Sequence, residues 1–348
     1  MNTELSLARI KEKIPPHCFE KSLPRSLSYM VRDLLLLSTA FFSFDWFSQT
    51  WIGLFLYWNI YGFLMWCVFV VGHDCGHGTF SKYKWINDIC GHICHGILFV
   101  PYWPWAYSHK KHHMFHNHVE KDQSHPWISK EKWRGLSRLE KAYIFSPLTP
   151  FIAYYFYLFF GLIDGSHILP FSKLYKDANK TEKIKCVIST LLIIGFGYLL
   201  IYYSQTLTFF FLFYGGCWVM FSFWLFLVTY MQHHKENSIV FDDNTWNYLD
   251  GALETIDRSF GFGIDNFHHN ITDGHVIHHL FFTQIPHYRL KEATYAVKEL
   301  LEQHKVYHHL KAQVFFMDFF KLFFKEHFTN WKLYKRPDGR DQSQISSK

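Results

Sequence analysis

Two long stretches of this sequence have almost no charge. Between Leu34 and Gly72 the only charged residue is Asp45, and between Cys186 and Gln232 there is none. Each stretch is about long enough for two membrane spans at roughly 20 residues a span. The scarcity of charge therefore predicts an integral membrane protein and disfavours two very apolar hairpins buried in a soluble core.

Each of these stretches has one polar break. The breaks contain Asp45, Ser48, Gln49 and Thr50 in the first stretch, and Ser204, Gln205 and Thr206 in the second. A backbone in hydrocarbon has to satisfy its own hydrogen bonds, so the spans are expected to be helices. We predict an all-α integral membrane fold with two transmembrane helical hairpins, about four spans, and a cytosolic His-rich helical domain. Within a single domain over residues 1–348, the hairpins occupy 33–72 and 186–232, and the cytosolic regions occupy 73–185 and 233–348.

Positive charge is missing from both breaks but not from the N-terminal segment. The cations that precede the first hairpin are Arg9, Lys11, Lys13, Lys21, Arg25 and Arg32. Because Lys and Arg stay on the cytoplasmic side of a membrane, an even number of crossings places both termini and the histidine-rich regions in the cytosol. We expect a multi-pass protein of the endoplasmic reticulum membrane. The net charge of +6 suits a face near anionic lipid and does not indicate nucleic acid.

Several familiar motifs are absent as well. Residues 1–20 are polar and include Pro15 and Pro16, so no cleavable signal is expected. The seven cysteines form no CxxC pair, which favours reduced thiols in a cytosol-facing protein. The chain has no haem-binding His-Pro-Gly-Gly segment and no flavin or dinucleotide fingerprint. Electrons for a redox reaction would therefore have to come from another protein.

Histidine, by contrast, is abundant, with 24 residues in the chain. The clustered ones form three boxes: His73 and His77; His109, His112 and His113; and His275, His278 and His279. Positions i, i+3 and i+4 share one face of a helix, so each box can aim two or three imidazoles at one point. Neutral imidazole binds zinc, copper, nickel and iron. The boxes hold more histidines than the four ligands of one tetrahedral zinc, so they predict two metals.

Other kinds of metal protein fit this pattern less well. A zinc protease has Glu after the first His of HExxH, where this chain has Asp74. Soluble di-iron bundles use Glu and Glu-x-x-His ligands, whereas these boxes are almost entirely histidine. A His-rich membrane metal transporter, the remote alternative, would carry ionisable residues inside its spans, and the second hairpin has no charged residue. Imidazole-bound metal beside apolar spans instead suits iron, O2 and an acyl-chain substrate.

A family resemblance rests on five segments in order along the chain. They are GHDCGHGTFS (72–81), SHKKHHMFHNHVEKD (108–122), TYMQHH (229–234), ETIDRSFG (254–261) and HNITDGHVIHHLFFTQIPHY (269–288). In these segments the chain resembles the membrane-bound fatty acid desaturases, and within them the methyl-end branch of omega-3 and Δ12 enzymes. The resemblance implies an O2-dependent di-iron oxidoreductase that uses two electrons to place a cis double bond in a fatty acyl chain, carried on a lipid or on coenzyme A.

The resemblance also implies ligands and partners. The implied iron ligands are His73, His77, His109, His112, His113, His275, His278 and His279, together with His269. His269 matches a ninth family ligand at the end of an Asn-x-x-x-His pattern. Asp265 stands where relatives often have Asn, which makes it a candidate water-mediated ligand. The implied cofactors are two iron ions, with O2 as co-substrate and electrons from cytochrome b5 and NADH-cytochrome b5 reductase. Basic segments such as Lys110-Lys111 and Lys130–Arg138 are expected to dock that partner.

The sequence of the boxes favours omega-3 over Δ12 activity. HDCGHG, with HVIHHLF and QIPHY, resembles omega-3 enzymes more than the HECGHH form of plant Δ12 enzymes. A Δ12 enzyme that converts oleate to linoleate, or a related acyl hydroxylase, stays open because such activities can arise from small changes around the boxes.

The remaining histidines and two segments are assigned other roles. His92 and His95 are interpreted as structural; His116, His118 and His125 as hydrogen-bond partners of ligands; His233, His234 and His268 as neighbours that do not ligate; and His304, His308 and His309 as solvated. Residues 143–163 form either a third span or an interfacial helix. Residues 311–328 form an amphipathic helix that lies on the membrane or closes the cytosolic domain.

Overall fold

The structure, a computed structural model, consists of two compact units. The histidine-rich unit comprises Met1–Glu20, His109–Ser146 and Val228–Lys348, and the apolar unit comprises Lys21–Ser108 and Pro147–Leu227. The residues that the structure describes are 5–122, 124, 127–128, 130–144, 146–152, 175–176, 178–311, 315–326 and 332–334. Helices make up most of this described chain.

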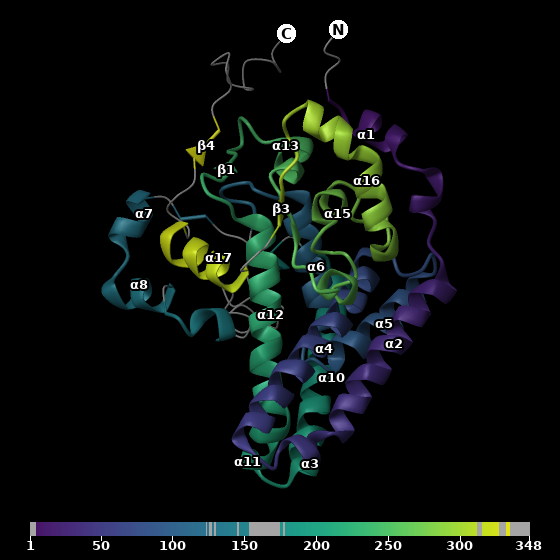
Figure 1. Ribbon diagram of the computed structural model, residues 1–348, viewed down its shortest axis with the longest axis vertical. Coiled ribbons are helices and arrows are strands. Elements are labelled where there is room, and N and C mark those ends of the chain that lie inside the picture. The colour runs from purple at the N-terminus through teal and green to yellow at the C-terminus, as the bar shows by residue number, and fades with distance from the viewer. Residues whose placement is uncertain are drawn as a thin grey trace. The chain divides into compact units, whose positions relative to one another are not determined.

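The apolar unit is built from helices alone, as far as it is described. They are α2 (Leu23–Phe42), α3 (Phe44–Phe47), α4 (Trp51–His77), α5 (Lys84–Gly96), α10 (Lys180–Ser204), α11 (Leu207–Phe210), the π turn Phe211–Gly215, and the starts of α6 (Tyr102–Met114) and α12 (Gly216–His233). Helix α4 packs against α2, beside it in Figure 1, and against α5. Its approach to α12 depends on Gly62, where an added Cβ would lie 2.6 Å from the Cβ of Met220.

Three helical stretches are long and apolar enough to cross a membrane, among the described residues. They are Trp51–His77, Lys180–Ser204 and Leu207–His233. Helix α2 is not one of them, because it carries Arg25 and the ion pair between Arg32 and Asp33, whose Nη2 and Oδ1 atoms are 2.7 Å apart. A membrane protein is therefore supported, while the fourth span and the pairing into hairpins stay predictions.

The helices break at the polar residues that interrupt the uncharged stretches. Helix α2 ends at Phe42, and α4 begins after Thr50, whose hydroxyl oxygen accepts a hydrogen bond from the backbone N–H of Gly53 at 3.0 Å. Helix α10 ends at Ser204, and the hydroxyl oxygen of Thr206 caps α11 by accepting from the N–H of Phe209 at 3.1 Å. The polar residues are there because helix ends leave N–H groups that need an acceptor.

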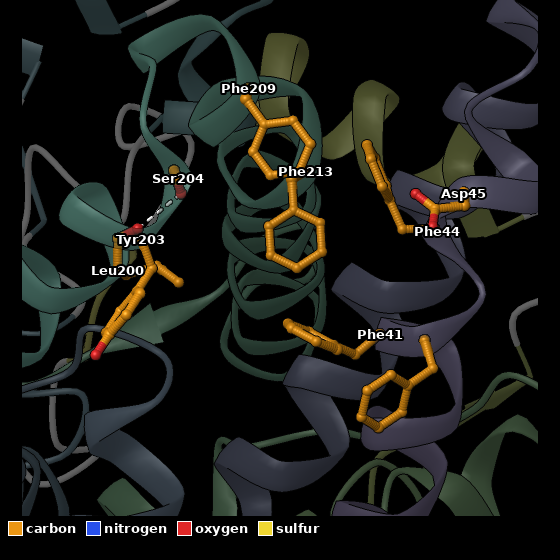
Figure 2. Close-up of a pocket in the computed structure, with 9 residues that line it drawn as sticks. Phe41, Phe44, Asp45, Leu200, Tyr203, Ser204, Phe209 and Phe213 are labelled. Atoms are coloured by element: carbon orange, nitrogen blue, oxygen red, sulfur yellow. Dashed lines mark hydrogen bonds between the residues drawn. The ribbon is translucent and has the colours of Figure 1, made fainter.

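A cavity of about 320 Å³ lies between these two breaks, inside the apolar unit. Its lining consists of Phe41, Phe42, Phe44, Asp45, Leu200, Tyr203, Ser204, Phe209 and Phe213. Figure 2 shows Phe209 and Phe213 between the residues at the end of α2 and those at the end of α10. Because the lining is mainly aromatic and contains no histidine, this cavity is not a metal site.

The histidine-rich unit combines short helices with four short strands. Its elements are α1 (Leu7–Lys13), the 3₁₀ turn η1 (Pro16–Phe19), the end of α6, α7 (Lys130–Gly135), α8 (Arg138–Ile144), β1 (Ile239–Val240), α13 (Tyr248–Leu253), β2 (Asp257–Ser259), α14 (Ile264–Phe267), α15 (His275–Leu280), α16 (His287–Gln303), β3 (His309–Lys311), α17 (Phe315–Lys321), η4 (Leu322–Glu326) and β4 (Lys332–Leu333). Strand β1 pairs with β4 and β2 with β3, both in parallel. The all-α expectation was wrong on this point, because strands of two or three residues are too short to show a period in the sequence.

The helix expected near the C-terminus is present as α17 and the π turn η4. Phe319 and Phe323 are fully buried, with their ring centroids 5.6 and 5.8 Å from that of Tyr230. Phe316 and Phe324 are exposed on the same segment. The buried pair packs this helix against Tyr230 of the histidine-rich unit, and whether its exposed side also meets a membrane stays a prediction. Most of the other ambiguous segment, residues 153–163 of 143–163, lies outside the described residues.

Candidate metal centre

The first box lies at the end of α4 in the apolar unit. His73 and His77 are one helical turn apart and buried, and their Nε2 atoms are 3.2 Å apart. Helix α4 stops directly after His77 because Gly78 adopts a left-handed conformation, with φ at 72°. The i, i+4 spacing thus gives a pair of convergent ring nitrogens, as the sequence predicted.

A second group of nitrogens comes from α6 and α15 in the histidine-rich unit. The Nε2 atom of His113 lies 3.0 Å from that of His109 and 3.2 Å from that of His278. His113 and His278 are buried. Residues from the second and third boxes, far apart in the sequence, therefore meet at one point.

A third group contains four histidines of the same unit. His112, His116, His233 and His279 are all buried, and each offers a ring nitrogen within 4.8 Å of the others. His275 touches this group, because its Nε2 atom is 3.1 Å from that of His233. We call these four residues the four-histidine cluster. Its members come from α6 and the turn after it, from the last residue of α12 and from α15.

The protonation state of this cluster suits a cation. Burial, followed by the neighbouring imidazoles, places the pKa of His279 and of His116 well below the usual value, so both rings are neutral. Both ring nitrogens of His279 are buried and have no hydrogen-bond partner among the residues that the structure describes. A buried polar group of this kind costs free energy unless something binds it. Neutral, convergent imidazoles are ligands for iron, zinc or copper, so the residues present fit a metal.

Asp122 fixes the orientation of the cluster. Its carboxylate is buried and accepts hydrogen bonds from the Nδ1–H of His112 at 2.8 Å and from the backbone N–H of Asn117 at 3.0 Å. The oxygen that accepts from Asn117, Oδ2, also lies 3.6 Å from Nδ1 of His116. Since Nδ1 of His112 is the donor, Nε2 is left as the nitrogen that faces a metal.

From the sequence, His116 was interpreted as a hydrogen-bond partner of ligands and His233 as a neighbour that does not ligate, and the structure places both among the clustered nitrogens. Two signals could have found them. His116 follows His112 with the same i, i+4 spacing as the first box, and His233 ends an apolar helix just as His77 does.

His269 and Asp265 lie elsewhere in the same unit. Neither belongs to a group of convergent donor atoms among the described residues. The ring of His269 packs against His287, with centroids 4.5 Å apart. Asp265 accepts hydrogen bonds from the N–H groups of Phe260 and Gly261 at 3.0 Å each and from the hydroxyl of Thr272 at 2.7 Å. These contacts make Asp265 a loop-capping residue.

Other histidines have structural partners. The buried ring of His95 stacks on Phe69 with centroids 4.8 Å apart, and His92 lies 2.9 Å from the hydroxyl of Ser189. Both agree with the structural role expected for them.

The histidines that flank the clusters are also held by neighbours. His118 contacts Asp243 at 3.2 Å, His234 stacks on Tyr230 with centroids 4.0 Å apart, and His268 packs against Phe260. His125 lies outside the described residues.

One expectation for the C-terminal histidines was wrong. His304 and His308 are half-buried rather than solvated, whereas His309 is exposed. His308 forms a hydrogen bond with Lys235, whose Nζ atom lies 2.7 Å from its Nε2 atom.

Asp257 of β2 contacts the first turn of α15, the helix that carries the third box. Its carboxylate is fully buried and accepts hydrogen bonds at 2.9 Å from the N–H of Val276, in the first turn of α15, and from the hydroxyl of Tyr307. Burial raises the pKa of this carboxyl to about 7, although the hydrogen bonds oppose the shift. Folding therefore favours the protonated form.

This shift predicts a pH dependence of stability. A folded-state pKa raised above the unfolded value gives stability that is complete below about pH 4 and is lost as the pH rises through about 7. We expect the melting temperature to fall between about pH 5 and pH 8, and to fall less in Asp257→Asn, which keeps an oxygen acceptor but cannot ionise. Thermal unfolding of both proteins in detergent at the two pH values measures this. Equal pH slopes would contradict it.

Comparisons with known proteins give matches over most of the chain. The family model for fatty acid desaturase matches residues 29–312. The chain is 39% identical over 321 residues to the Δ12 fatty acid desaturase fat-2 of Caenorhabditis elegans, covering 91% of this chain and 85% of that protein. It is 39% identical to the omega-3 fatty acid desaturase fat-1 of the same organism, covering 84% and 72%. It is 40% identical to the endoplasmic reticulum omega-3 desaturase of Vigna radiata, covering 85% and 77%.

Proposed function

Since this chain belongs to the fatty acid desaturase family, we propose that it is a methyl-end desaturase of omega-3 type, which converts n-6 into n-3 acyl chains. The single observation that carries the desaturase reaction is the presence, in a chain of this family, of two groups of convergent imidazoles within the histidine-rich unit. Δ12 desaturation of oleate is the second candidate, and similarity to fat-2 favours it equally.

We assign one iron to the four-histidine cluster together with His275, and a second to His109, His113 and His278. His73 and His77 are proposed as further iron ligands on their own spacing. His233 takes the role that the family resemblance gave to His269. Bound iron would supply the O2-dependent removal of two hydrogens from the acyl chain.

The chain's own residues would orient the iron ligands and exclude water from the site. Asp122 holds the Nδ1 proton of His112 and thereby directs Nε2 inward. Asp257 and Tyr307 hold the first turn of α15, from which the third box projects. The burial of all four cluster histidines excludes water from the reacting position.

The electron donor and the location are part of the proposal. The sequence has no haem-binding His-Pro-Gly-Gly segment and no flavin or dinucleotide fingerprint, so the electrons would come from another protein. Exposed lysines such as Lys110 suit an acidic electron donor of the cytochrome b5 kind, which NADH-cytochrome b5 reductase would reduce. We place the protein in the endoplasmic reticulum membrane with its boxes on the cytosolic side. An acyl-lipid or an acyl-CoA would present the substrate chain from that membrane.

Expression in yeast with fed fatty acids tests the function. Cells given linoleate or arachidonate are expected to form the corresponding n-3 products, because the double bond is added near the methyl end. Gas chromatography with mass spectrometry locates the new bond. Conversion of oleate to linoleate alone would favour the Δ12 candidate, and no new double bond in cells that contain the folded protein would overturn both. A His275→Ala variant with full activity would remove the third box from the mechanism.

A further inference from the structure

A group of metal-ligating side chains of another kind lies where η1 meets α16. His17, Cys18 and Glu292 each offer one donor atom, and these atoms lie within 4.8 Å of one another. The donors are an imidazole nitrogen, a thiol sulfur and a carboxylate oxygen. All three residues belong to the histidine-rich unit, and none belongs to the imidazole groups assigned to iron.

We propose that His17, Cys18 and Glu292 form a binding site for one Zn²⁺ ion. Thiolate, imidazole and carboxylate are the ligand types of protein zinc sites, and three protein ligands with one water complete a tetrahedral set. A soft thiolate distinguishes this site from the imidazole-only groups and favours zinc over magnesium or calcium.

The geometry needs only a small adjustment to hold the ion. The Nε2 atom of His17 lies 2.5 Å from Oε1 of Glu292. Zinc–nitrogen and zinc–oxygen bonds of about 2.0 to 2.2 Å place such atoms about 3.4 Å apart in a tetrahedral site, so this pair has to open by roughly 1 Å. Both side chains are close to half exposed, at 45% and 44%, which leaves them room to move and gives the ion a path to the buried Cys18.

The charges of the proposed ligands also suit a divalent cation. Arg289 contacts the other oxygen of Glu292, with its Nη1 atom 3.1 Å from Oε2, so Oε1 is the oxygen that faces His17. A thiolate and a carboxylate balance the two charges of zinc. Burial, and then the negative charge of Glu292, raises the pKa of the Cys18 thiol to about 11, so the thiol is protonated without metal. On binding, the sulfur forms a bond to zinc and its proton leaves to solvent.

The position of the site gives it a structural consequence. The turn η1 and helix α1 both pack on α16, and α16 packs on α15, which carries the third box. Phe19, next to Cys18, lies edge-on to Phe281 at the end of α15, with ring centroids 5.7 Å apart. Zinc would therefore fasten the N-terminal segment to the helices behind the third box.

Metal analysis of the full-length protein tests the site. The iron-loaded protein, purified in detergent, is incubated with excess Zn²⁺ and then freed of loosely bound metal. We expect about one zinc per chain, with one zinc–sulfur distance of about 2.3 Å by X-ray absorption spectroscopy at the zinc edge. The zinc–sulfur distance marks the proposed site, because the imidazole groups contain no cysteine. The measurement does not depend on desaturation, so it can succeed or fail independently of the proposed function.

Matched cysteine variants make the assignment specific. Cys18→Ser is expected to lose the zinc–sulfur signal and to weaken zinc binding at least about 10-fold, and Glu292→Gln to weaken it with sulfur still bound. Cys90→Ser is the control, because Cys90 is a buried thiol of α5 outside the three groups of convergent donors. Wild-type protein that retains no zinc, or zinc without a sulfur ligand, would overturn the proposal whether or not the variants fold. Equal zinc binding by Cys18→Ser and Cys90→Ser would also overturn it.

Discussion

Replacing His233 with alanine is expected to abolish desaturation and to reduce bound iron from about two ions per chain to about one. Its ring nitrogens converge with those of His112, His116 and His279, and its Nε2 atom lies 3.1 Å from that of His275. The variant lacks one of the four clustered ring nitrogens. The other group in the same unit shares none of these residues, so its iron should be kept. Metal analysis and fatty acid profiles of yeast that express the variant measure both effects.

His234 offers a matched control, because it is the next residue and is equally buried. Its ring stacks on Tyr230 at an interplanar angle of 5°, and Nδ1 lies 3.1 Å from the Tyr230 carbonyl oxygen. His234→Ala removes packing but no clustered nitrogen, so it should lower the melting temperature and keep both irons. If the two variants lost iron to the same extent, His233 would be a packing residue and the assignment of the cluster would fail.

The sequence predicted the apolar helices well because their signal is local. Absence of charge marks a span, and polar residues mark the breaks, where Thr50 and Thr206 cap the next helix. The start of α2 could not be predicted from hydropathy, since Arg25, Arg32 and Asp33 lie inside a helix that continues into apolar residues. Strands β1 to β4 could not be predicted either, because each depends on a partner from a distant part of the chain.

The candidate site was predictable only in part for a related reason. The i, i+4 pairs His73 with His77 and His109 with His113 follow from helix geometry alone. Helix geometry alone does not predict how the histidines of the second and third boxes divide between the two groups. His112 and His113 are adjacent in α6, yet one belongs to the four-histidine cluster and the other to the group with His109.

His278 and His279 of α15 divide in the same way. Neighbouring residues on a helix point about 100° apart, so one HxxHH box can contribute to two groups of imidazoles. His116 and His233 escaped prediction because their place in the cluster depends on how three separate segments pack.

Replacing Asp122 with alanine is expected to lower desaturase activity about 10- to 100-fold, the usual cost of losing the hydrogen-bond partner of a metal-bound histidine. The buried carboxylate accepts from Nδ1 of His112 at 2.8 Å and also ties down the backbone of Asn117. Without it, His112 is free to rotate or to exchange the proton between its two nitrogens. Activity in fed yeast and iron content together measure the loss, and iron should fall less steeply than activity because all of the histidines remain.

Asp243→Ala separates this orienting effect from the general loss of a carboxylate beside a histidine. Asp243 lies 3.2 Å from Nε2 of His118, but its side chain is 63% exposed and His118 is outside the clusters. Water can replace an exposed acceptor, so this variant should keep nearly full activity. Equal losses in both variants would show that the region needs negative charge rather than a fixed tautomer. A loss confined to Asp122→Ala ties the effect to the proton on Nδ1 of His112, and therefore to which nitrogen faces the metal.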